Sequence, residues 1–108
     1  MAKRQNIKII KILVKNYLKY LEDNCAIKIK QAYLYGSYAK NKEHEFSDID
    51  VAIVSNQFKG NRFDDMKKIY KHIKNFDVRI EPMPLNDKDF NEGNPFIDEI
   101  KKTGIKII

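Results

Sequence analysis

The alternation of apolar and polar residues predicts a helix and then a strand at the start of the chain. Between Gln5 and about Leu21, apolar residues recur every three or four positions, which is typical of an amphipathic helix. The predicted buried stripe consists of Ile7, Ile10, Val14, Tyr17, Leu18 and Leu21. The polar residues 22–24 should end this helix. From Ala26 to Tyr35, apolar and polar residues alternate before an apolar end, which predicts the first strand.

The middle of the chain is predicted to hold two more strands and a second long helix. The run from Asp48 to Val54 is the second strand, and it should lie antiparallel to the first because its start must adjoin the first strand's end. A helix follows, with Asn61 as its cap and its end at 74–75. Its predicted buried stripe is Phe63, Met66, Ile69 or Tyr70, and Ile73. Residues 76–81 alternate cleanly and predict a third strand, which the next two prolines should end.

The last part of the chain is predicted to be helical with an apolar end. Residues 86–90 favour a short helical turn, and Asn94 precedes a last helix from Phe96 to Lys102, which Gly104 should end. The residues expected to be buried there are Phe96, Ile97 and Ile100. Residues 105–108 are too apolar to be left in solvent, so they should add a short edge strand, pack on the core, or contact a partner.

These elements predict an α/β (or α+β) fold in a single domain, residues 1–108. A small mixed sheet should be covered by helices on one face, with a cleft on the other. The one cysteine, Cys25, excludes an internal disulfide and favours the reducing cytoplasm. No apolar run approaches the length of a membrane span, so no membrane partner is expected.

Candidate chemistry is concentrated between Tyr33 and Val54. Gly36 and Ser37 end an apolar run where a short helical turn, from Ser37 to about Asn41, should begin, followed by a charged loop over 42–46. Glycine lets the backbone turn sharply, and the unpaired amides that open a helix attract phosphate. Asp48 and Asp50 lie two apart in a strand, so both carboxylates should point to one face. Like charges this close repel unless a cation lies between them, and oxygen ligands favour Mg²⁺.

The net charge of +6 is concentrated in the first 30 residues, which hold eight lysines and arginines against two acids. Lysines at 8, 11, 15 and 19 follow one stripe of the first helix. A solvated surface is the interpretation we favour, because charge runs on exposed helices are common. The alternative is a ridge that binds RNA or an acidic partner, which would make binding strongly dependent on salt.

The segment G-S-Y-A-K-N-K-E-H-E-F-S-D-I-D, residues 36–50, resembles the signature of the DNA polymerase β-type nucleotidyltransferase superfamily. Its pattern is Gly-Ser, a short helix, and Ser-Asp-x-Asp before apolar residues. The short chain is also similar to the minimal nucleotidyltransferases, the small partners of HEPN-domain proteins in prokaryotic toxin–antitoxin pairs. After the alanine, the family usually has a basic residue and then glycine; here Lys40 keeps the charge and Asn41 replaces the glycine.

The resemblance implies a third carboxylate on the third strand, and Asp77 is the position that matches. Asp77, Arg79 and Glu81 should share one face of that strand, which suits the lining of a cleft. The alternative is that Asp77 only pairs with Arg79 or with solvent on an edge strand. Glu81 is a weaker candidate, because it lies further along the strand than Asp77.

The resemblance therefore implies a nucleotidyltransferase. Asp48, Asp50 and Asp77 would be the catalytic and metal-binding residues and would share two Mg²⁺ ions, and Gly36 and Ser37, with help from Lys40, would hold the phosphates of a nucleoside triphosphate. ATP would donate AMP to a hydroxyl of a partner protein, a HEPN-type toxin, which would make the chain a protein adenylyltransferase and an antitoxin. Two alternatives stay open: a silent module that neutralises the HEPN partner by contact alone, and a basic adaptor for nucleic acid.

Overall fold

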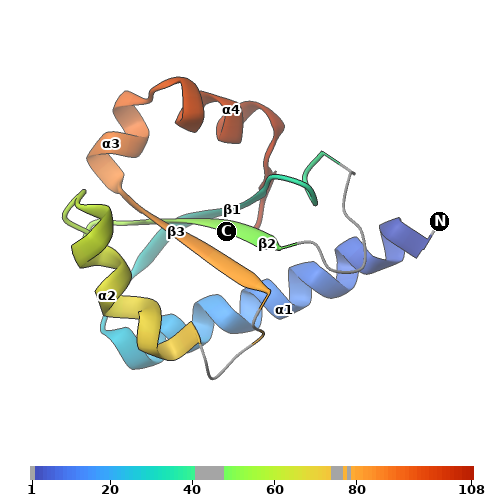
Figure 1. Ribbon diagram of the computed structural model, residues 1–108, viewed down its shortest axis with the longest axis horizontal. Helices are drawn as coiled ribbons and strands as arrows, with labels where there is room; N and C mark the ends of the chain where they lie inside the picture. Colours follow the sequence, from blue (N-terminus) through green and yellow to red (C-terminus); the bar gives the residue numbers. More distant parts are fainter. Residues whose placement is uncertain (1, 41–47, 74–76, 78) are drawn as a thin grey trace.

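A mixed four-stranded sheet lies at the centre of the computed structural model, which describes residues 2–40, 48–73, 77 and 79–108 (Figure 1). The strands are β1 (Ile29–Tyr35), β2 (Ile49–Ser55), β3 (Ile80–Asn86) and β4 (Ile105–Lys106). Their order across the sheet is β3-β2-β1-β4. β1 pairs antiparallel with β2, as predicted, and with β4, whereas β2 and β3 are parallel.

Helices lie on both faces of this sheet. α1 (Ala2–Cys25) and α2 (Arg62–Ile73) lie on one face, and α3 (Asp87–Glu92) and α4 (Pro95–Thr103) lie on the other (Figure 1). The predicted fold class, a small mixed sheet with packed helices, is confirmed. The layer of helices formed by α3 and α4 on the second face was not expected. It forms because Val54, Phe90 and Ile97 make a small core of their own beyond the sheet.

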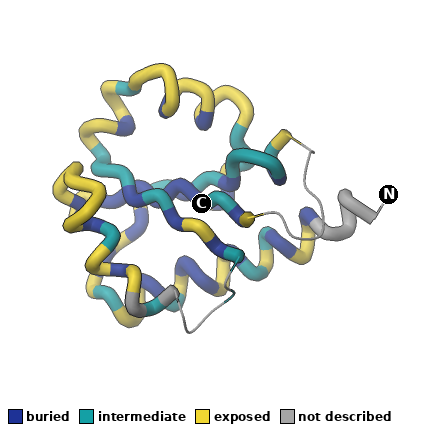
Figure 2. The backbone as a smooth tube through the Cα atoms, viewed as in Figure 1, coloured by how far each residue is buried: buried dark blue, intermediate teal, exposed yellow. Residues whose placement is uncertain are grey.

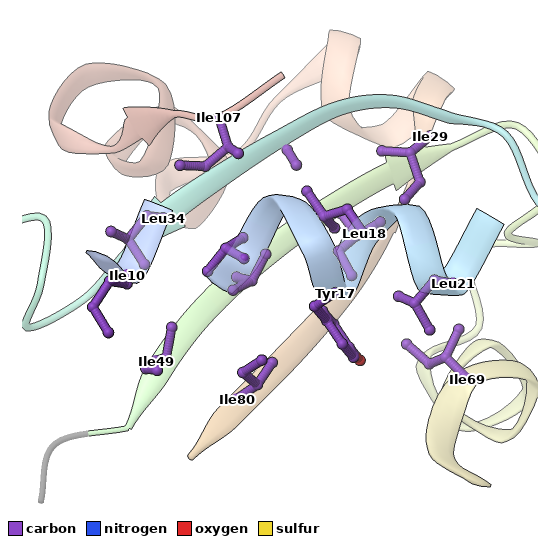
Figure 3. Packing of buried hydrophobic residues seen from close by; sticks show 14 of the residues in the cluster. Ile10, Tyr17, Leu18, Leu21, Ile29, Leu34, Ile49, Ile69, Ile80 and Ile107 are labelled. Atoms are coloured by element: carbon purple, nitrogen blue, oxygen red, sulfur yellow. The ribbon is translucent and has the colours of Figure 1, made fainter. Parts of the chain in front are cut away.

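The main core lies between the sheet and α1. All six residues of the predicted stripe on α1 are buried, and they pack against Leu34, Ile49 and Ile80 of the strands (Figure 3). Figure 2 shows the result, with buried residues following the central strands and exposed ones covering the outer surfaces of the helices. This burial fixes which face of β2 is internal, so it also fixes the direction of Asp50, which lies on the opposite face from Ile49.

α1 is longer than predicted, because the polar residues expected to end it support its last turn. The Asn24 side chain donates to the Tyr20 carbonyl at 2.8 Å. Glu22 accepts from the Ile29 amide at 2.9 Å, which ties the helix end to the start of β1. Ala26 then reverses the chain with a φ of 55°, a left-handed conformation that ends helices.

α2 begins where predicted, and it buries part of its predicted stripe. The Asn61 side chain accepts from the Asp64 amide at 3.2 Å and so caps the helix. Of the two alternatives Ile69 and Tyr70, Ile69 is the buried one, whereas Phe63, which was predicted to be buried, is 69% exposed. Asp65 is also buried, at 1% exposed, and its carboxylate accepts from the Lys59 and Gly60 amides at 2.8 and 3.0 Å. The predicted helix end at 74–75 lies outside the described residues.

The predicted third strand is wrong in its bounds. β3 begins at Ile80 and continues through Pro82 and Pro84, which were expected to end it. Proline is tolerated here because β3 is an edge strand, with β2 on one side only. A turn precedes the strand, closed by the Ile80 amide and the Asp77 carbonyl at 3.1 Å. That turn breaks the alternation that was predicted to run through residues 76–81.

The C-terminal elements follow the prediction closely. Asn86 caps α3 and Asn94 caps α4, and the Gly104 amide donates back to the Ile100 carbonyl at 2.7 Å. β4 forms the predicted edge strand, and Ile107 is buried. Phe96 is the exception, since it is 46% exposed rather than buried. Within the described residues, no helix is both long and apolar enough to cross a bilayer.

Candidate active site

The Gly36 corner and Asp50 are in direct contact, as the sequence predicted. β1 and β2 pair so that Tyr35 lies opposite Asp50, which brings the end of β1 to the start of β2. Gly36 has a φ of +73°, and a Cβ atom there would collide with the Asp50 carboxylate. The position therefore requires glycine for two reasons, its backbone angle and its space. Gly36 and Asp50 form a single structural unit.

Asp50 lies in a group of acidic side chains. It is half-buried and faces away from the core, while Asp48 is exposed just before β2. The parallel register places Glu81 of β3 opposite Asp50. Burial raises the pKa of the Asp50 carboxyl, and the nearby charges of Asp48 and Glu81 raise it further. Among the described residues, none of these three carboxylates has a salt-bridge partner.

Asp77 has a different environment. It precedes β3, and its carboxylate accepts from the Arg79 guanidinium at 2.8 and 3.1 Å and from the Arg79 amide at 2.9 Å. These hydrogen bonds from Arg79 lower the pKa of the Asp77 carboxyl. The structure thus forms the Asp77–Arg79 pair that the sequence left as an alternative, and it places Glu81, not Asp77, beside Asp50. Glu81 is identified as the neighbour of Asp50 by the register of β3 against β2. That register depends on where β3 begins.

The acidic group can supply up to two carboxylate ligands to one divalent cation. Among the described residues, no three histidine, cysteine or acidic side chains lie close enough to hold one metal ion together. Mg²⁺, however, is usually bound through one or two carboxylates, with water and phosphate oxygens in the rest of its shell. Asp50, with Asp48 before it and Glu81 opposite, supplies carboxylates whose mutual repulsion a cation would remove. The donor set therefore suits Mg²⁺ bound together with a phosphate ligand.

The turn after Gly36 is helical in character. The Lys40 amide donates to the Gly36 carbonyl at 3.1 Å, which closes one turn over residues 36–40. Ser37 lies on this turn and is half-buried. The Lys40 ammonium lies 3.6 Å from the Glu99 carboxylate of α4, and both side chains are about half exposed. A cavity of about 260 Å³ lies beside the turn, lined in part by Gly36, Lys40 and Glu99. Asn41 and Ser47, which the resemblance also used, lie outside the described residues.

Two residues of this region were not found from the sequence, Tyr35 and Arg62. Tyr35 shares the face of Asp50, and its ring packs edge-on against Phe96 with the centroids 5.7 Å apart. Burial raises the pKa of Tyr35 to about 12, with a further contribution from Asp50, while the positive charge of Arg62 acts in the opposite direction. The position of Tyr35 directly before Gly36 was a usable signal. Arg62 reaches the region only through the placement of α2, so no sequence pattern indicated it.

A glycine turn that touches a carboxylate group on a mixed sheet is the arrangement of proteins that bind a metal with a nucleoside triphosphate. The family model described as "Polymerase beta, Nucleotidyltransferase" matches residues 8–108. The chain therefore belongs to the polymerase β nucleotidyltransferase family, which confirms the resemblance seen in residues 36–50. No curated protein matches the chain.

Solved structures share the fold at low identity. A nucleotidyltransferase candidate from Sulfolobus solfataricus is 17% identical, with a TM-score of 0.71 over 98% of this chain and 86% of that one. A toxin–antitoxin crystallised with AMP-PNP is 18% identical, with a TM-score of 0.53 over 86% and 71% of the two chains. A mutant of the toxin–antitoxin MntA–HpeT, with two aspartates two positions apart changed to glutamate, is 17% identical, with a TM-score of 0.56 over 87% and 70%.

Proposed function

We propose that the chain is a Mg²⁺-dependent nucleotidyltransferase that transfers AMP from ATP to a hydroxyl group of a partner protein. The observation that carries the proposal is the group of Asp48, Asp50 and Glu81, which has no basic partner among the described residues and touches the Gly36 turn. Unpaired carboxylates this close are costly without a cation. In this family, such a group has a direct use in catalysis.

Each residue has a proposed role in the reaction. Asp48 and Asp50 would hold the metal ions, and Glu81 would take the place that the resemblance gave to Asp77. When bound, Mg²⁺ would neutralise phosphate charge and lower the pKa of the attacking hydroxyl. The amides of the turn at Gly36 and Ser37 would bind the β- and γ-phosphates. Lys40 could add a positive charge there once it leaves Glu99.

The bond changes balance without any further reactant. The acceptor oxygen forms a bond to the α-phosphorus, the bond from that phosphorus to the β-phosphate oxygen breaks, and pyrophosphate leaves. The hydroxyl proton goes to a nearby carboxylate, for which Glu81 is the best-placed candidate because it lies opposite Asp50 on the neighbouring strand. Asp77 is held by Arg79, which keeps it ionised but occupied.

The acceptor is proposed to be a HEPN-type toxin, with this chain as its antitoxin. Fold likeness to toxin–antitoxin structures, one of them crystallised with AMP-PNP, supports this proposal. The mutated aspartates of the MntA–HpeT structure have the spacing of Asp48 and Asp50 here. We infer that the partner supplies its own hydroxyl, on a tyrosine by resemblance.

The test is a transfer reaction with the product of the neighbouring gene as acceptor. The protein, ATP labelled at the α-phosphate, Mg²⁺ and that product are incubated, and mass spectrometry measures whether the product gains AMP. Asp50→Asn should abolish transfer. Asp64→Asn, an exposed change in the first turn of α2, is the matched control and should leave transfer unchanged.

The same variants separate catalysis from contact. If Asp50→Asn protects cells from the toxin as well as the unmodified protein does, the chain acts by binding alone and the transferase proposal fails. If the partner gains no AMP but labelled nucleotide appears on RNA, the acceptor is wrong. Reversing the charge of the lysine stripe on α1 should then abolish that RNA labelling, because the stripe is the basic surface that the sequence indicates.

A further inference from the structure

A second cavity lies on the same face of the sheet as the acidic group. Its volume is about 320 Å³, within the usual range for small-molecule sites. Met83 and Leu85 of β3 line one side, and Phe96 and Ile97 of α4 line another. Arg62, at the start of α2, also lines it. The cavity is thus mainly apolar, with one cation among its lining residues.

Strand register connects this cavity to the acidic group. Glu81 lies opposite Asp50, and Met83 lies opposite Ala52, so Met83 follows Glu81 on the same face. Two residues of a strand span roughly 7 Å. The charge of Arg62 also acts on Tyr35, which feels Asp50 and Glu81 as well. Glu81 of the acidic group and Met83 of the cavity are therefore consecutive residues on one face of β3.

We propose that this cavity binds the base of the nucleotide donor, with Phe96 as the surface on which the base stacks. The inference rests on the function proposed above and extends it. With the phosphates held near Gly36 and the α-phosphorus over Asp50, the nucleoside would continue along β3 towards Met83. Phe96 is 46% exposed, and its ring contacts Tyr35 on one side and lines the cavity on the other. An aromatic ring held in this way is pre-organised for stacking.

Two polar residues that line the cavity, Asn94 and Asp89, match one edge of adenine. Asn94 accepts from the Ile97 amide at 2.8 Å through its Oδ1 atom, and among the described residues nothing accepts from its side-chain NH₂ group. The Asp89 carboxylate faces Gly60 at the rim, with an oxygen 3.0 Å from where a Cβ would stand. The pair offers a donor and an acceptor. Adenine presents the complementary N7 acceptor and N6 amino donor, whereas guanine has only acceptors, N7 and O6, at the same edge.

Calorimetric titration with Mg²⁺ present tests the proposal, using ATP, GTP and inorganic tripolyphosphate as probes. Phe96→Ala should weaken ATP binding by about tenfold, a typical effect of removing one aromatic stacking partner, and leave tripolyphosphate binding unchanged. Phe96→Tyr should bind ATP as the unmodified protein does, and Phe96→Leu should fall between. Phe63→Ala, which removes another exposed phenylalanine ring from α2, is the control and should have no effect. Asp89→Asn should reduce the preference for ATP over GTP.

The outcomes distinguish a failure of the proposed base site from a failure of the proposed transferase function. ATP binding that is insensitive to Phe96→Ala and to Phe96→Leu, while tripolyphosphate also binds, overturns the base site and leaves the transferase proposal standing. Loss of AMP transfer with unchanged ATP binding assigns the cavity to the acceptor and also overturns the base site. If neither ATP nor tripolyphosphate binds the unmodified protein, both proposals fail. Should Phe96→Ala unfold, the comparison of Phe96→Tyr with Phe96→Leu decides the question alone.

Discussion

Replacing Gly36 by alanine should damage the protein through two separable effects. The backbone φ of +73° is unfavourable for any residue with a Cβ, at a cost of about 1–2 kcal/mol. The added Cβ would also collide with the Asp50 carboxylate, and moving that side chain off its preferred rotamer costs about 0.5–1.5 kcal/mol. Together they predict a loss of about 1.5–3.5 kcal/mol in the free energy of unfolding.

Urea unfolding of a double-mutant cycle separates the two effects. In an Asp50→Ala background the collision is absent, so Gly36→Ala should cost only about 1–2 kcal/mol, the backbone contribution. Gly60→Ala is the matched control. Gly60 also has a positive φ, +93°, but its nearest neighbour is Asp89, so its cost should be the same in both backgrounds. Equal costs of Gly36→Ala with and without the Asp50 side chain would refute the contact between the two residues.

Four further predictions concern the charged groups. The pKa of the Asp50 carboxyl is raised in the folded state, so its contribution to the free energy of unfolding is lost as pH rises through that pKa. Asp50→Asn should therefore be more stable than the unmodified protein at pH 7. Urea titrations should show this difference in stability vanish below about pH 4. For activity, Glu81→Gln should lose AMP transfer about 100-fold or more while Asp77→Asn keeps most of it, and the reverse order in a pyrophosphate-release assay would restore Asp77 as the third carboxylate. The Asp77 pKa is lowered by Arg79, so that pair stabilises the fold above about pH 4; Arg79→Ala should cost at most about 1 kcal/mol at pH 7, and this cost should shrink as pH falls below about 4 and Asp77 becomes protonated. Asp65→Ala should cost about 2–3 kcal/mol in thermal unfolding, because two amides of the preceding loop lose a charged acceptor, and a cost under 0.5 kcal/mol would contradict the buried position of Asp65.

The sequence was sufficient where a pattern is local and repeated. The stripe on α1 and the apolar positions of β2 identify the core, because a helix or strand that buries one face leaves a regular period in the sequence. The contact between Gly36 and Asp50 could also be predicted. It needs only that the end of one strand adjoin the start of the next, and the antiparallel pairing of β1 with β2 ensures this.

The sequence was insufficient where a distant contact decided the local structure. The start of β3 depends on the turn at Asp77, which no apolar period indicates. Where β3 begins decides which acidic residue lies opposite Asp50. Asp77 was the expected third carboxylate, but the observed register places Glu81 there. The burial of Asp65 likewise depends on two amides of the preceding loop, which no local pattern indicated.

Pro82 and Pro84 also affect how copies of the chain behave towards one another. Just before β3, the Arg79 carbonyl accepts from the Ile49 amide of β2. Backbone groups of a strand alternate in direction, so those of the even-numbered residues in β3 point away from β2. At two of these outward positions proline supplies no amide hydrogen. An added strand from a second molecule would find too few donors there to extend the sheet, so the outer border of β3 is protected against aggregation without any cost to its packing on β2.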